Sequence, residues 1–119
     1  MNGIILDGQG LTELPDSLDP NILELSAANN QLRTPRLTGI ALTTLNLSIN
    51  LVEGLDDLPP LPDLLALDLS DNALVSTFGI TAFPKLREID MSGNNIHVLD
   101  GFELLALTHL LADRCIIII

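Results

Sequence analysis

One eleven-residue pattern recurs along this chain and constrains its fold more than any other feature. Its clearest copy, Leu64–Leu74, reads Leu-x-x-Leu-x-Leu-x-x-Asn-x-Leu. The Asn position recurs at residues 9, 30, 50, 72, 94 and 115, so the steps are 21, 20, 22, 22 and 21 residues. Self-similarity at a nearly fixed period of this length predicts a solenoid of stacked repeats.

Each copy is expected to contribute a short strand around its central Leu-x-Leu. In the clearest copy, Leu67 and Leu69 should point into the solenoid, because side chains alternate along a strand. By the same rule, Ala66, Asp68 and Ser70 should point outward. One repeat cannot bury its own apolar row, so the stacked copies must share a single core beneath a parallel sheet.

The Asn position predicts a structural ladder. The chain turns inward after each strand, and the backbone N–H and C=O groups there leave the sheet. A buried amide carries donors and an acceptor, so it can satisfy these groups across neighbouring turns. Gln9 takes the position in the degenerate first copy, and the thiol in the last copy is expected to be structural rather than nucleophilic. The predicted ladder consists of Asn30, Asn50, Asn72, Asn94 and Cys115.

The segments that return to the next strand are expected to be extended, turn-like or 3₁₀. Pro15 and Pro20 exclude a regular helix from residues 11–20. The third repeat has an apolar residue at every third position over residues 52–64, which is the period of a 3₁₀ helix. The fifth repeat offers core residues at Ile96, Leu99, Phe102 and Leu105. Residues 102–107, which lack Pro and Gly, are the best candidate for a helical turn.

Two return segments depart from this regularity. Pro35 stands where a third-position Leu is usual, so Leu37 and Ile40 are expected to fill the core of the second repeat. In the fourth repeat, either Thr77 or Phe78 must take the corresponding core position.

The pattern resembles the leucine-rich repeat family, and the resemblance covers the whole chain. The 22-residue repeats with apolar residues at every third position look like the phosphatase-regulator class, which is also seen in axonemal dynein light chains. The shorter N-terminal repeats, with Leu14-Pro15 and residues 19–25, look more like the bacterial effector class.

The resemblance implies an α/β-type leucine-rich-repeat solenoid in which residues 1–119 form a single domain of six repeats without evident caps. It implies a parallel sheet on the concave face and an irregular or 3₁₀ convex side. Because these families bind proteins, it also implies a protein–protein interaction module, acting as a scaffold or regulatory subunit, rather than an enzyme.

Charge and cysteine content limit the classes of partner and the cellular compartments that suit this chain. The formal net charge is −11, from 16 acidic against 5 basic residues, which argues against nucleic acid and membrane and fits a basic protein surface. Cys115 is the one cysteine, and neither a secretory signal pattern nor a long apolar run is visible. These features favour a reducing, cytoplasmic setting. Asn46 heads an N-glycosylation motif, which matters only in a secreted protein.

The outward-facing residues of the predicted strands carry the candidate binding site. Three columns of outward residues run across the strands, and none of them contains Lys or Arg. Acids concentrate in the last three repeats, which favours an acidic groove for a Lys/Arg-rich partner; a solvated face kept soluble by its charge remains the alternative. The predicted partner-binding residues are Glu24, Asn46, Asp68, Ser70, Glu88, Asp90, Ser92, His109, Leu111 and Asp113.

Asp68 and Asp90 should be neighbours in the central column, since adjacent strands lie about 4.8 Å apart. Like charges this close recruit a cation or raise one pKa. A bridging Lys or Arg of a partner, simple solvation, a bound Ca²⁺ and a paired-carboxylate hydrolase all remain open. The hydrolase is the least favoured, because an open sheet gives no water-excluding pocket. On this reasoning, Asp68→Ala should cost almost no stability.

No other chemistry is indicated. His97 and His109 are expected to be surface residues, far apart in register. A phosphate-binding Gly-rich loop, zinc-ligand spacing and a catalytic triad are all missing from the sequence. We therefore expect no catalytic residue, metal or cofactor. The alternatives to a scaffold are a structural component of a large assembly, axonemal or virion, and the recognition part of a larger effector enzyme.

The C-terminal end is expected to be a contact surface. Ile117 has a core position by register, but the rest of the Ile116–Ile119 run has none. An uncovered last strand and an apolar tail would favour self-association or contact within an assembly.

Overall fold

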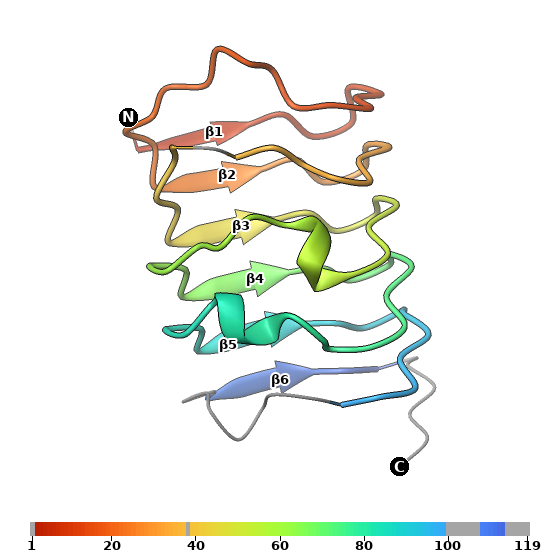
Figure 1. Ribbon diagram of the computed structural model, residues 1–119. Helices are drawn as coiled ribbons and strands as arrows, with labels where there is room; N and C mark the ends of the chain where they lie inside the picture. Colours follow the sequence, from red (N-terminus) through yellow and green to blue (C-terminus); the bar gives the residue numbers. More distant parts are fainter. Residues whose placement is uncertain (1, 38, 100–107, 114–119) are drawn as a thin grey trace.

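The computed structural model describes residues 2–37, 39–99 and 108–113. The chain winds into a solenoid that adds one parallel strand at each turn, from β1 at one end to β6 at the other (Figure 1). The strands are β1 (Gly3–Ile5), β2 (Glu24–Ser26), β3 (Thr44–Asn46), β4 (Ala66–Asp68), β5 (Glu88–Asp90) and β6 (His109–Leu111). Their order in the sheet is their order in the sequence, which confirms the predicted leucine-rich-repeat solenoid.

The register of the sheet is the one that the repeat predicts. Ala66 pairs with Glu88, Leu67 with Ile89 and Asp68 with Asp90. The same three columns continue from β1 to β6 without a shift. Equivalent residues of every repeat therefore lie side by side across the sheet.

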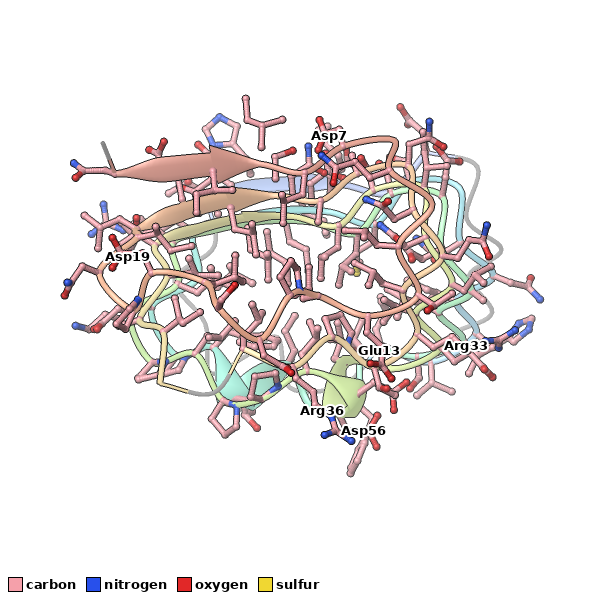
Figure 2. All side chains as sticks on the ribbon, turned by 90° about the horizontal axis from the view of Figure 1, so that it is seen from above. Asp7, Glu13, Asp19, Arg33, Arg36 and Asp56 are labelled. Atoms are coloured by element: carbon pink, nitrogen blue, oxygen red, sulfur yellow. The ribbon has the colours of Figure 1, made fainter. Side chains whose placement is uncertain are left out.

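The core lies between the sheet and the return segments, where inward-pointing side chains fill the space (Figure 2). It is almost wholly aliphatic, with Phe83 as its largest fully buried side chain. Leu67 and Leu69 are buried as expected, whereas Asp68 between them is only partly covered. Glu13, Arg36 and Asp56 lie on the side opposite the sheet, so the return segments carry their own charged surface (Figure 2).

Two of the return segments contain one turn of 3₁₀ helix each, η1 (Leu55–Asp57) and η2 (Ile80–Ala82). The apolar residues at every third position over residues 52–64 are all buried, which confirms the predicted path of the third repeat. In the fourth repeat, Thr77 is the buried residue and Phe78 is exposed. Burial of a threonine leaves the larger apolar side chain in solvent.

Pro35 is itself buried and takes the third-position slot of the second repeat. Leu37 is also buried, and Ile40 packs partly against the core. The prediction for Leu99 is wrong, because this side chain is 42% exposed. It lies on the last return segment that the structure describes in part, and no described turn packs on its outer side. The proposed helical turn at residues 102–107 lies outside the described residues.

Candidate functional site

The asparagine positions form a continuous hydrogen-bonded ladder behind the ends of the strands. In Asn50, the Oδ1 atom accepts from the Leu32 N–H at 3.0 Å. Its Nδ2 atom donates to the carbonyl oxygens of Ala27, Leu47 and Ser48 at 3.0, 3.0 and 3.2 Å. One amide thus links two turns of the solenoid.

The same bonding pattern recurs along the stack. Asn30, Asn72 and Asn94 each accept from a backbone N–H of the preceding turn and donate to carbonyls of both turns. Asn30, Asn50 and Asn94 are buried, and Asn72 is partly buried. Cys115 lies outside the described residues. The ladder holds the strand ends at fixed spacing, so it positions the outward columns.

A hollow of about 430 Å³ lies on the outward face of the sheet over β3 to β6. We call it the groove. Its outward lining residues are Thr44, Asn46, Ala66, Asp68, Glu88, Asp90, His109 and Leu111, and the buried Leu45, Leu67 and Ile89 between them complete the lining. Six of the predicted partner-binding residues therefore come together in one place.

The groove is negatively charged. Asp68, Glu88 and Asp90 line it, and among the described residues its lining contains no Lys or Arg. The His109 Nδ1 atom lies 3.7 Å from the Glu88 Oε1 atom, and both side chains are largely exposed. A groove with carboxylates on two adjacent strands attracts cationic groups more strongly than a flat surface with the same charges.

Four predicted site residues lie outside the groove. Glu24 and Asp113 are exposed, and Ser70 is partly buried. Ser92 requires a correction: it is only 7% exposed, and its Oγ atom accepts from the Asp113 N–H at 3.2 Å. The next turn covers Ser92, so this residue offers a partner almost no surface.

The central column has a structural role that was not predicted from the sequence. The Oδ1 atoms of Asn46, Asp68 and Asp90 accept from the N–H two residues ahead, at 2.9, 3.0 and 3.0 Å. Asp68 also accepts from the Ser70 Oγ at 2.7 Å. Such Asx turns satisfy the backbone where the strand ends. The recurring Asn/Asp-x-Ser triplet is the sequence signal that indicates them.

These bonds correct the expectation that Asp68→Ala costs almost nothing. The substitution removes the acceptor of the Ser70 N–H and should lower the free energy of unfolding by about 0.5–1.5 kcal/mol. Asp68→Asn keeps the acceptor, as Asn46 does on β3, and removes repulsion with Asp90. It should be neutral or stabilising. Urea unfolding followed by circular dichroism would compare the variants, and an Asp68→Ala protein as stable as Asp68→Asn would contradict the role of the Asx turn.

The two histidines differ in their surroundings. His109 is exposed at the edge of the groove. His97 is partly buried, and its Nδ1 atom is enclosed without a hydrogen-bond partner among the described residues, so the expectation of a surface histidine fails there. Within residues 2–37, 39–99 and 108–113, no group of three or more His, Cys, Asp or Glu side chains is arranged to hold a metal ion.

The last strand is more exposed than the others. Leu110 is 47% exposed, although its equivalents Leu67 and Ile89 are buried, and Leu111 beside it is exposed as well. The Ile116–Ile119 tail lies outside the described residues. In the described part of the chain, no helix is long and apolar enough to cross a membrane.

Residues 85–110, which include β5 and the start of β6, match the family model described as Leucine Rich Repeat. No curated protein matches the chain. The match and the geometry of the stacked strands agree: the fold is that of a leucine-rich-repeat solenoid. Domains of this kind generally mediate protein–protein interaction and typically act as binding scaffolds without catalysis.

Proposed function

We propose that this protein is a non-enzymatic interaction module that binds a basic segment of a partner protein in the groove. The single observation that carries the proposal is the convergence of Asp68, Glu88 and Asp90 in one hollow whose described lining residues include neither Lys nor Arg. The module would act in the cytoplasm as a scaffold or regulatory subunit.

The position of the carboxylates supports a role in binding. Asp68 and Asp90 are direct neighbours on β4 and β5, and Glu88 lies two residues before Asp90 on the same face. A Lys or Arg side chain placed between the strands could contact more than one carboxylate at once. Complementary charge of this kind contributes chiefly to association rate and to specificity.

The open shape of the groove supports a protein partner rather than a small molecule. Small-molecule sites usually enclose most of the ligand in a largely apolar cavity. Here the hollow lies on the face of a sheet and spans four strands. Four strands cover roughly 14 Å across the sheet, since neighbouring strands are about 4.8 Å apart. An extended segment of about four or five residues spans that distance.

Charge reversal tests the proposal. Glu88→Lys together with Asp90→Lys should weaken binding of a fluorescein-labelled octapeptide of alternating lysine and serine by at least about tenfold in 50 mM salt. The reason is that two groove carboxylates become like charges to the peptide. Fluorescence anisotropy measures the dissociation constant.

The matched control is Glu13→Lys with Asp16→Lys, which changes the net charge equally on the return side of the solenoid. Both residues are exposed there, and Glu13 lies opposite the sheet (Figure 2). This pair should weaken binding less than about threefold, and the difference between the pairs should shrink in high salt as the Debye length falls. Equal effects of both pairs would show that only the overall charge matters and would refute the groove.

A further inference from the structure

Ile49 adopts a backbone conformation that isoleucine strongly disfavours. Its φ is +54°, in the left-handed region, where a β-branched side chain clashes with its own backbone. The position is the one directly before the ladder asparagine in each repeat. The other repeats place there residues that tolerate this conformation, namely Gly8, Asn29, Asp71 and Gly93, all with positive φ.

The neighbouring turns impose this conformation on Ile49. Its N–H donates to the Ser70 carbonyl at 2.9 Å, and its carbonyl accepts from the Asn30 N–H at 3.2 Å. The equivalent N–H groups of Asn29 and Asp71 make the same bond to the next turn. Ile49 cannot relax to a negative φ without breaking the stack, so the chain retains a residue that strains this turn.

Burial of the Ile49 side chain in the core does not offset the strain. The Ile49 side chain is 51% exposed, and Leu51, two residues further on, is also exposed. We call these two side chains the rim patch. Strained backbone that the surrounding structure holds in place is concentrated at ligand-binding sites. A strained residue that also presents aliphatic surface to solvent is best explained by a partner that covers it.

The rim patch begins a short distance along the chain from the groove lining. Asn46 lines the groove at the end of β3, and Ile49 follows three residues later, at most about 11 Å along the chain. A segment that lies across the carboxylates of β4 and β5 can therefore reach Ile49 with two or three further residues. The negative charge of the groove identifies the occupant as basic.

We propose that Ile49 and Leu51 form an apolar anchor for the same basic segment that the groove binds, so that the recognised sequence combines lysines or arginines with a large aliphatic residue. This inference rests on the proposed function of the groove. It adds a specificity that charge alone cannot provide, because an aliphatic side chain gains only where apolar surface receives it.

Two labelled octapeptides test the anchor. Both alternate lysine with a second residue, which is leucine in one peptide and serine in the other, so their charge is equal. The wild-type protein should bind the lysine–leucine peptide about tenfold more tightly. Ile49→Asn should abolish this preference and leave lysine–serine binding unchanged. The same variant should raise the melting temperature by about 3–8 °C, because asparagine accepts a positive φ.

Val98→Asn is the matched control. Val98 is also β-branched and 55% exposed, but it has no positive φ and belongs to the fifth repeat rather than to the third. Its substitution should change neither the peptide preference nor the melting temperature appreciably. A more stable Ile49→Asn protein that still prefers the leucine peptide would overturn the anchor and leave the groove intact. Equal binding of the two peptides by the wild type would do the same, whereas failure to bind either peptide would overturn the groove as well.

Discussion

Replacing Leu67 with alanine should lower the free energy of unfolding by about 2–5 kcal/mol. Leu67 is 3% exposed at the centre of β4, with Leu45 and Ile89 beside it in the same column of the sheet. Truncation removes most of the side chain and leaves a cavity that the hydrogen-bonded strands on both sides keep from collapsing. Chemical denaturation followed by circular dichroism measures the loss.

Leu110→Ala provides the control for this effect. Leu110 belongs to the same column, through its pairing with Ile89, but it is 47% exposed. The same chemical change should therefore cost less than about 1.5 kcal/mol, because less apolar surface returns to water. If the two variants lost equal stability, Leu110 on β6 would have to be as buried as Leu67 on β4, which would contradict the structure.

The sheet could be predicted from the sequence because its information is local and repeated. Every strand carries the same Leu-x-Leu, and counting from one Asn position to the next fixes the register. The neighbouring positions of Asp68 and Asp90 follow directly from that count. The three-residue period over residues 52–64 likewise indicated the 3₁₀ path that contains η1.

Burial along the solenoid axis was less predictable, since it depends on the neighbouring turn and not on the residue alone. Leu99 has the same register as the buried Thr77, yet it remains exposed at the end of the described stack. Ser92 shares its register with the partly buried Ser70, but its hydroxyl lies against the backbone of the next turn and is covered. The residue pattern of a single repeat predicts neither the exposure of Leu99 nor the burial of Ser92.

The candidate site likewise combines features that the sequence predicts with features that depend on packing between strands. The residue types in its outward columns could be predicted from the sequence. The hollow over β3 to β6 could not, because it forms only where the side chains of four different strands come together. The strain at Ile49 was hidden for a different reason. Its residue type gives no hint of a positive φ, and only its register with Gly8 and Gly93 does so.

Asn50→Ala should lower the free energy of unfolding by about 2–4 kcal/mol, because the buried amide serves both the turn that carries it and the preceding one. The Leu32 N–H would lose the acceptor that it has at 3.0 Å. The carbonyls of Ala27, Leu47 and Ser48 would lose their shared donor. Asn95→Ala is the control, since Asn95 is exposed and should change stability by less than about 0.5 kcal/mol.

Asn50→Asp tests the acceptor oxygen and the donor nitrogen of this amide separately. The aspartate keeps an oxygen for the Leu32 N–H but, when ionised, places negative charge against carbonyl oxygens that need a donor. At neutral pH it should therefore destabilise the fold at least as much as Asn50→Ala. Protonation restores one donor, so the variant should regain stability relative to Asn50→Ala as the pH falls toward 4. Denaturation curves at pH 7 and pH 4 measure this difference, and an aspartate variant as stable as the wild type at pH 7 would mean that the Nδ2 donations do not hold the turns together.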